Sequence, residues 1–175
     1  MDSVTITSGE YRGRKILTPG KGTHPMGSRE KLALFNMITE KVNEATLLDA
    51  FAGSGALGIE ALSRGASKVV FVDKSREATD IIKKNLASLG LKNECEVIKG
   101  SIHELVDSLG EFEIIIADPP YDNFDKTEVS ELPRVLKKGG IFVLSHPGEV
   151  PDLPGLTLLK THQYASAHIS IYVKN

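Results

Sequence analysis

An acid, two prolines and an aromatic ring stand together at residues 118–121, directly after a run of strand-forming residues in FEIIIADPPY. Two consecutive prolines cannot continue a sheet, because each lacks a backbone donor and has a fixed φ. The strand therefore ends abruptly between Asp118 and Tyr121. A carboxylate, a free carbonyl and a ring at one place could hold a planar amine. The alternative is a turn that merely ends the strand, with Asp118 capping the next helix.

A planar exocyclic amine is a poor nucleophile, since its lone pair is delocalised into the ring. Acceptors for its two N–H bonds favour the pyramidal nitrogen of the transition state over the planar ground state. Asp118 can supply one acceptor and the Pro119 carbonyl the other, with Pro120 fixing their direction. The Tyr121 ring could stack on the planar group that carries the amine; for a nucleic-acid base such a contact is worth roughly 1–3 kcal/mol and offsets part of the cost of unstacking it. These four residues are the predicted catalytic segment.

A glycine-rich segment, DAFAGSGALGIEAL, has the spacing G-x-G-x-x-G at Gly53, Gly55 and Gly58. A strand pattern precedes it and a helical pattern follows, so a tightly turned backbone and unpaired helix N–H groups could approach a nucleotide. Asp73 ends the next strand, where a carboxylate can accept both hydroxyls of a ribose. The pattern fits NAD as well as S-adenosylmethionine.

Asp49 separates these two ligands. It lies immediately before the glycine loop, where its charge would repel a pyrophosphate and attract the ammonium group of a methionine moiety. The alternative for Asp49 is a helix-capping carboxylate. The segment at 118–121 also has no use in a dehydrogenase. Both features favour S-adenosylmethionine, and an NAD-dependent oxidoreductase is the less favoured interpretation.

Strand and helix patterns alternate around these residues. The strand patterns lie at 46–51, 68–73, 95–100, 112–118 and 141–147, and the helical patterns at 28–42, 55–65, 75–90, 101–110 and 125–140. Such alternation predicts right-handed crossovers and a parallel sheet with helices on both faces. The last stretch, 156–175, reads as an antiparallel hairpin with its turn near 164–167. We predict an α/β fold with a mostly parallel seven-stranded sheet.

Several residues are expected to begin or end helices. Ser28 is the expected N-cap of the first helix, with Glu30 in its first turn. Gly90 is expected to end the helix at 75–90. Ser101 and Glu104 have the S-x-x-E spacing of a capping box, which favours a capping role for Ser101.

The N-terminal segment is basic although the whole chain has a net charge of −2. Residues 11–31 contain six basic residues and one acid. Such a segment fits a binder of phosphate backbone, and a solvated hairpin with chance charges is the alternative. We expect residues 1–27 to form a basic hairpin or loop extension of a domain that spans 28–175. The predicted phosphate contacts are Arg12, Arg14, Lys15, Arg29 and Lys31.

Composition limits the remaining possibilities. With 41% hydrophobic and 25% charged residues, the 175-residue chain fits one globular domain. Cys95 is the only cysteine, which excludes an internal disulfide, and it is expected to be a small buried hydrophobe. No signal peptide and no apolar run of ~20 residues is apparent, so we expect a cytoplasmic protein. The five histidines lack the spacing of metal ligands, so we expect no metal site. We expect the histidines to lie at the surface or in loops. For His146 the alternative is a position in the wall of the pocket.

The chain resembles the RsmD family of class I, S-adenosylmethionine-dependent methyltransferases, which act on the guanine N2 amine of 16S ribosomal RNA. The resemblance spans nearly the whole chain and rests on YRGRKI at 11–16, Arg29, LFN at 34–36, FAGSGALGIEALSRGA and DPPY. It implies a Rossmann-like class I methyltransferase fold, with residues 118–121 holding the target base. The implied cofactor-binding residues are Asp49, Phe51, Gly53, Gly55, Asp73, Lys74, Ser101, Ile102 and Asp118.

The sequence departs from the family pattern at two places. Ser101 stands where the family has an acid or amide that can bind the adenine amino group, so we expect backbone N–H groups such as that of Ile102 to bind adenine. In the segment 24–32, Lys31 replaces an arginine and Leu32 an acid. The resemblance further implies ribosomal RNA as the partner, either as naked RNA or within a partly assembled small subunit. We expect a monomer as the simpler default, with a dimer through the apolar edge of the terminal strand as the alternative.

Other activities could use the same residues. An adenine-N6 or a glutamine-amide methyltransferase would also need the segment at 118–121, although the basic N-terminal segment argues against a peptide substrate. A non-enzymatic RNA-binding module would instead show salt-dependent RNA affinity that survives the loss of Asp118.

Overall fold

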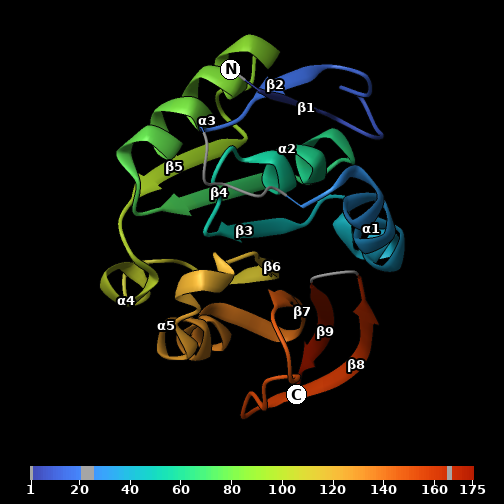
Figure 1. The fold of residues 1–175 in the computed structure, drawn as a ribbon, viewed down its shortest axis with the longest axis vertical. Helices are drawn as coiled ribbons and strands as arrows, with labels where there is room; N and C mark the ends of the chain where they lie inside the picture. Colours follow the sequence, from blue (N-terminus) through green and yellow to red (C-terminus); the bar gives the residue numbers. More distant parts are fainter. Residues whose placement is uncertain (1, 21–25, 165–166) are drawn as a thin grey trace.

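The computed structural model describes residues 2–20, 26–164 and 167–175. Seven strands form one sheet in the order β5-β4-β3-β6-β7-β9-β8 (Figure 1). Strands β3 to β7 are mutually parallel where they pair, and β9 runs antiparallel between β7 and β8. The strands are β3 (Thr46–Ala50), β4 (Lys68–Asp73), β5 (Cys95–Lys99), β6 (Phe112–Ala117), β7 (Leu136–His146), β8 (Leu156–Gln163) and β9 (His168–Lys174). The predicted seven-stranded α/β fold with its C-terminal hairpin is therefore confirmed.

Helices cover both faces of the sheet. They are α1 (Ser28–Val42), α2 (Ala56–Ser63), α3 (Arg76–Leu89), α4 (Ile102–Leu105) and α5 (Lys126–Glu131). Successive residues of β3 point to opposite faces, so Leu47 packs in the core beneath α1, α2 and α3, and Leu48 in the core beneath α4 and α5. This double burial explains why the parallel strands are almost entirely apolar.

The predicted helix at 125–140 is wrong in its second half. Helix α5 ends at Glu131 and a short 3-10 helix follows (Leu132–Val135), with Pro133 near its start. Proline cannot donate the hydrogen bond that would continue the α-helix. Strand β7 therefore begins at Leu136 and includes the lysines and glycines that were expected to end the helix.

The helix caps were predicted with one error. Gly90 closes α3 in the left-handed conformation with φ 74°, and Ser101 forms the expected capping box with Glu104. Gly27, and not Ser28, is the N-cap of α1, and Ser28 is the first helical residue. The N-cap residue of a helix has an extended backbone, and here that residue is Gly27. The N-cap therefore lies one residue before Ser28, the residue that was expected to occupy it.

The N-terminal residues form a two-stranded antiparallel hairpin, β1 (Ser3–Thr5) with β2 (Lys15–Leu17). The hairpin packs against α2: the Glu10 N–H donates to the Ser63 carbonyl at 2.8 Å, and the Tyr11 N–H to the Ser63 hydroxyl at 2.9 Å. A Cβ at Gly9 would lie 1.8 Å from the Ser63 carbonyl oxygen, so only glycine allows this approach. The hairpin is thus fixed to the domain. The expected boundary at 27/28 stays a prediction.

His146 and Cys95 differ from their predicted environments. His146 is fully buried on β7, where its Nε2 lies 2.8 Å from the Ser170 hydroxyl, so neither a surface position nor the pocket position is correct. Cys95 is only partly buried.

Three of the predictions concern residues outside the described ranges. These are residues 165–166 of the predicted turn, Lys21 and His24. No helix in the described part of the chain is long and apolar enough to cross a membrane.

Candidate active site

A cavity of about 610 Å³ lies at the carboxyl ends of β3, β4, β6 and β7. This is the edge at which open α/β sheets bind ligands, because loops leave the strands there in opposite directions. The structure brings most of the predicted site residues to its wall. Those lining the cavity are Asp49, Phe51, Gly53, Asp73, Lys74, Ser101, Ile102, Asp118, Pro119, Pro120 and Tyr121. Gly55 is not in the wall; it is the left-handed N-cap of α2.

The glycine loop joins β3 to α2 and is held by Asp49. The Asp49 carboxylate accepts a hydrogen bond from the Gly58 N–H at 2.8 Å, and a Cβ at Gly58 would lie 2.3 Å from the Phe71 ring. The third glycine therefore allows α2 to pack closely on the sheet. Burial raises the pKa of Asp49 well above its usual range, against the Gly58 hydrogen bond and together with the charges of Asp118 and Asp73. Asp49 thus both caps α2 and faces the cavity.

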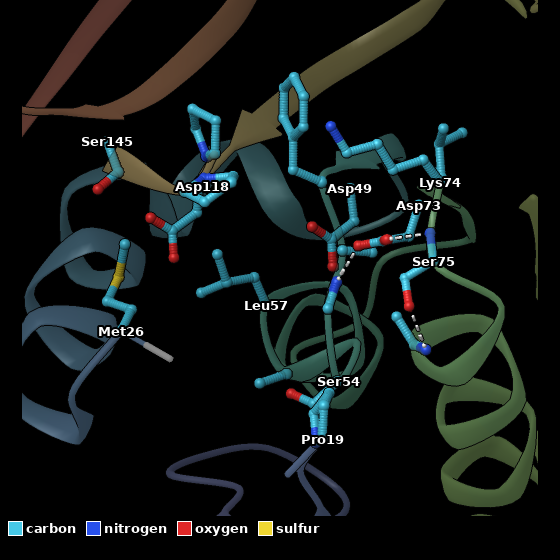
Figure 2. Close-up of a pocket in the computed structure, with 18 of the residues that line it drawn as sticks. Pro19, Met26, Asp49, Ser54, Leu57, Asp73, Lys74, Ser75, Asp118 and Ser145 are labelled. Atoms are coloured by element: carbon cyan, nitrogen blue, oxygen red, sulfur yellow. Dashed lines mark hydrogen bonds between the residues drawn. The ribbon is translucent and has the colours of Figure 1, made fainter. Parts of the chain in front are cut away.

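Phe51 lies in the strained left-handed region, with φ 59°. A non-glycine residue there costs of order 1–3 kcal/mol and is found mostly at functional sites. Its neighbour in the loop, the Gly53 N–H, donates to the Asp73 carboxylate at 2.8 Å, and the Ser75 N–H donates to the other oxygen at 2.8 Å. A carboxylate has about four acceptor positions, so Asp73 can still accept ribose hydroxyls. Figure 2 shows Asp73 beside Asp49 in the cavity.

The segment at 118–121 lies next to Ser145 of β7. Ala117 and Leu144 are paired across β6 and β7, so Asp118, the residue after β6, lies beside Ser145, which is still within β7 (Figure 2). Burial raises the pKa of Asp118 to about 6, and a hydrogen bond from the Ser145 side chain opposes that rise. The Tyr121 hydroxyl also bonds to the Ser145 hydroxyl. No sequence motif marks Ser145, which only the strand register reveals.

At the start of α4, the capping role predicted for Ser101 is confirmed, but the N–H of Ile102 is not free for adenine. Ser101 lines the cavity but its side chain accepts from the Glu104 N–H, as a cap. The Ile102 N–H, which was expected to bind adenine, donates instead to Glu128 Oε1 at 2.9 Å. That donor is therefore engaged within the protein. Glu128 itself lines the cavity and was not identified from the sequence.

The described wall of the cavity is strongly acidic. It carries one basic side chain, Lys74, and seven carboxylates, Glu30, Asp49, Asp73, Glu77, Asp118, Asp122 and Glu128. Such a wall favours a ligand with positively charged groups and opposes a pyrophosphate. The sulfonium and ammonium groups of S-adenosylmethionine fit this wall, and the phosphates of NAD do not.

The predicted phosphate-binding residues do not gather at the cavity. Arg12, Arg14, Lys15 and Arg29 are exposed, but Arg14 donates to the Ser88 carbonyl near the end of α3 at 2.9 Å. Ser88 is 12 residues from the start of α3, which at 1.5 Å per residue places the hairpin tip roughly 18 Å along the helix from the cavity edge. Arg29 lies closer, between the cavity-lining residues Gly27 and Glu30.

Lys31 is a wrong prediction. It is 2% exposed, and its ammonium group lies 3.1 Å from Glu60 Oε2 and donates to the Thr5 carbonyl at 3.0 Å. The same buried Glu60 accepts from the Thr7 and Ser8 backbone N–H groups at 3.0 and 3.1 Å and pairs with Arg64. Lys31 therefore joins α1 to the hairpin and α2, and it cannot reach a phosphate in this arrangement.

The fold and the site together define an α/β methyltransferase, and comparisons with known proteins support this class. Residues 4–173 match the family model described as "Conserved hypothetical protein 95". The chain is 33% identical over 183 positions to "Putative rRNA methyltransferase YlbH" of Bacillus subtilis, covering 98% of this chain and 99% of that protein. It is 38% identical over 123 positions to "Ribosomal RNA small subunit methyltransferase D" of Haemophilus influenzae, covering 67% of this chain and 64% of that protein.

A solved structure agrees over the full length. The protein titled "Putative methyltransferase yhhF from Escherichia coli" superposes with a TM-score of 0.90 at 28% identity, covering 99% of both chains. This chain belongs to the RsmD/YlbH family of rRNA methyltransferases. Its cofactor is accordingly S-adenosylmethionine, which the glycine loop, the free acceptor positions of Asp73 and the acidic cavity fit.

Proposed function

We propose that this chain methylates the exocyclic N2 amine of a guanine in 16S ribosomal RNA. The observation that carries the proposal is the position of Asp118, which leaves β6 at the cavity wall with its pKa raised to about 6. Its alternative role is not seen: Asp125, and not Asp118, caps α5 by accepting from the Thr127 N–H at 2.8 Å. An acid in a ligand cavity with a perturbed pKa and no capping role is typical of a functional group.

Two acceptors are available to the amine. The Asp118 carboxylate is ionised above about pH 6 and can accept one N–H bond. The Pro120 carbonyl accepts from the Asn123 N–H at 3.2 Å, whereas the Pro119 carbonyl has no hydrogen-bond partner within the described ranges. Pro119 can therefore accept the second N–H bond. Together they would favour the pyramidal nitrogen of the transition state.

Ser145 positions both the acid and the ring. A serine hydroxyl has one proton, so if Ser145 donates to Asp118 the Tyr121 hydroxyl must donate to Ser145. This chain of hydrogen bonds would fix the direction of the Asp118 oxygens and the tilt of the Tyr121 ring. The ring can then stack on an extruded base while its hydroxyl is held at the β7 side of the cavity.

When bound, S-adenosylmethionine supplies an electrophilic methyl group. The residues that would hold it are Asp49, Phe51, Gly53, Asp73, Lys74 and Ser101, with Gly55 shaping the loop and Asp118 at the border with the base. The acidic wall admits a neutral base and opposes the entry of RNA phosphates, so the backbone is held outside.

RNA contacts are assigned to the exposed basic residues. Arg29 stands at the cavity rim, and Arg12, Arg14 and Lys15 lie on the hairpin roughly 18 Å away along α3. Such a span requires several nucleotides of substrate, which fits folded ribosomal RNA in a partly assembled small subunit better than a short oligonucleotide. The extension at 1–27 would thus serve RNA binding by a monomer, while 28–175 carry out methyl transfer.

Radiolabelled methyl transfer, followed by nucleoside analysis, tests the proposal. Substrates are small-subunit RNA alone, the same RNA with assembled ribosomal proteins, and large-subunit RNA as control. We expect label in N2-methylguanosine from the small-subunit substrates. Label in N6-methyladenosine or in a protein amide would show that the four-residue segment acts on a different amine, and no label in any substrate would contradict the proposal.

A further inference from the structure

Helices α4 and α5 lie side by side on one face of the sheet (Figure 1). The side chain of Glu128 joins them at the cavity. The Glu128 side chain reaches from α5 to the first residue of α4, where Oε1 accepts from the Ile102 N–H at 2.9 Å. The residue is 9% exposed, and it lines the cavity beside Ser101 and Ile102. A buried carboxylate is thus placed at the cavity wall beyond the ribose-binding position of Asp73.

Only part of the acceptor capacity of Glu128 is used. Within the described ranges, the hydrogen bond from Ile102 involves one of its two oxygens, and Oε2 has no protein partner. A carboxylate that is largely removed from water and incompletely paired costs free energy, because it has lost hydration without gaining a full set of donors. A donor on the ligand would satisfy it.

The adenine ring of the cofactor carries such a donor in its 6-amino group. The Ser101 hydroxyl already accepts from the Glu104 N–H, which leaves it one acceptor position on a neutral group, whereas Glu128 leaves a whole carboxylate oxygen. The Ile102 N–H is also engaged, so the free group at this end of the cavity is an acceptor. We propose that Glu128 recognises the adenine amino group: Oε1 keeps the Ile102 N–H, and Oε2 accepts from the 6-amino group.

This assignment gives Glu128 the role of a specificity-determining residue, and it rests on the proposed methyl-transfer function because it requires an adenosyl cofactor. It also accounts for a serine at 101. The acceptor comes from α5 and crosses to α4, so residue 101 is left to cap its helix. A purely structural tie between the helices would require only the Ile102 hydrogen bond.

The test is isothermal calorimetry with two ligands on the purified full chain. The first ligand is S-adenosylhomocysteine, and the second is its analogue with hydrogen in place of the 6-amino group. The variants are Glu128→Gln and, as a matched control on the same helix, Glu131→Gln, whose side chain contacts His103 outside the cavity wall. In Glu128→Gln we expect the amide oxygen to keep the fixed backbone N–H of Ile102, which turns the amide NH2, a donor, toward the adenine 6-amino group and removes the acceptor for it.

The wild-type protein and the Glu131→Gln control should bind S-adenosylhomocysteine about 10- to 100-fold more tightly than the analogue, as expected for a hydrogen bond to a charged acceptor. In Glu128→Gln the preference should fall to within about threefold. Equal affinity of the wild type for both ligands would overturn the inference, as would a preference that Glu128→Gln leaves unchanged. If neither ligand binds the wild type, the proposed methyl-transfer function fails as well. Failure of that function can therefore be distinguished from failure of adenine recognition by Glu128 alone.

Discussion

Glu60 under the N-terminal hairpin is fully buried and Asp118 in the cavity is partly buried, and the partners of these two acids differ. Glu60 is joined by Thr7, Ser8, Lys31 and Arg64. Burial alone would raise its pKa, but the hydrogen bonds from Thr7 and the charge of Lys31 outweigh it, so the pKa lies below its usual value. Asp118 has Ser145 as its neighbour, and there burial prevails and raises the pKa to about 6.

The difference separates a structural acid from a functional one. A fully paired buried carboxylate has no acceptor to offer a ligand, and the removal of one of its partners destabilises the fold. An incompletely paired carboxylate costs stability when it is ionised, and that cost is recovered when a ligand donates to it. The same contrast predicts what substitutions at each place should do.

Asp118→Asn should have the largest effect. Without the charged acceptor, we expect methyl transfer to fall by about 10²- to 10³-fold, the loss typical of one preorganised transition-state contact. S-adenosylhomocysteine affinity should stay within a few-fold of wild type. Single-turnover rates and calorimetry measure the two quantities, with the exposed Asp80→Asn as control. Equal losses of rate and cofactor affinity would contradict the division between base and cofactor sites.

The same variant should be more stable than the wild type at pH 8. The folded-state pKa of Asp118 is raised from 3.8 to about 6, so its contribution to stability is present below pH 3.8 and is lost as the pH rises through about 6. Replacing it by a neutral amide should recover about 1–3 kcal/mol of unfolding free energy. Urea denaturation checks this, and a destabilised Asp118→Asn would show that the acid serves the fold.

Lys31→Met should lower the stability of the fold and leave RNA binding unchanged. It leaves Glu60 buried with Arg64 as its remaining cationic partner, and we expect a loss of about 3 kcal/mol of unfolding free energy. Arg29→Met, an exposed change of equal charge two residues earlier, should cost almost nothing. Thermal unfolding of both variants decides the point. Similar stability of the two would mean that the Lys31–Glu60 pair is unimportant for the fold.

Ser145→Ala should have an intermediate effect. Its loss removes a hydrogen bond that lowers the pKa of Asp118, so that pKa should rise further. We expect about a tenfold lower rate at neutral pH, because a hydrogen bond to a charged group is worth about 1.5–3 kcal/mol. The acid limb of the pH–rate profile should also move upward. Ser170→Ala, a buried serine outside the cavity wall, is the control, and an unmoved pH profile would exclude the positioning role.

Arg12→Ala with Arg14→Ala should have the smallest effect. We expect a few-fold weaker RNA binding, with the slope of log affinity against log salt reduced by about 1–2. Filter binding at several salt concentrations measures it. Lys160→Ala, an exposed lysine on the edge strand β8, is the control. An unchanged slope in the double variant would remove the hairpin tip from the RNA-binding surface.

The sequence was sufficient to predict the order of strands and helices along the chain and the position of the glycine loop. Both depend on local patterns, alternating helix and strand segments and the glycine spacing, that do not need distant partners. Asp49 and Asp73 lie at the ends of strands, and the segment at 118–121 directly follows one. Because the carboxyl ends of parallel strands meet at one edge of the sheet, the clustering of these residues could also be predicted.

The residues that were missed depend on register and on contacts between distant elements. Ser145 meets Asp118 because Ala117 pairs with Leu144, which no local pattern indicates. Glu128 reaches the cavity through a bond to Ile102, 26 residues away. Lys31 looked like part of a basic segment, but its burial depends on Glu60 of another helix. Charge and spacing in the sequence predict which residues could bind a ligand or take part in catalysis. Tertiary packing decides which of these residues are accessible to the ligand.

The contrast between Glu60 as a structural acid and Asp118 as a functional acid is tested most directly by a carboxyl-carbon NMR titration of both residues in the same sample. Burial also raises the pKa of Asp49, so the Asp118 carboxyl signal is assigned by its loss in Asp118→Asn. We predict that Asp118 titrates near pH 6, above its usual 3.8, and that Glu60 titrates below its usual 4.5. An Asp118 that titrates at or below its usual value would contradict the assignment of this acid as the functional one.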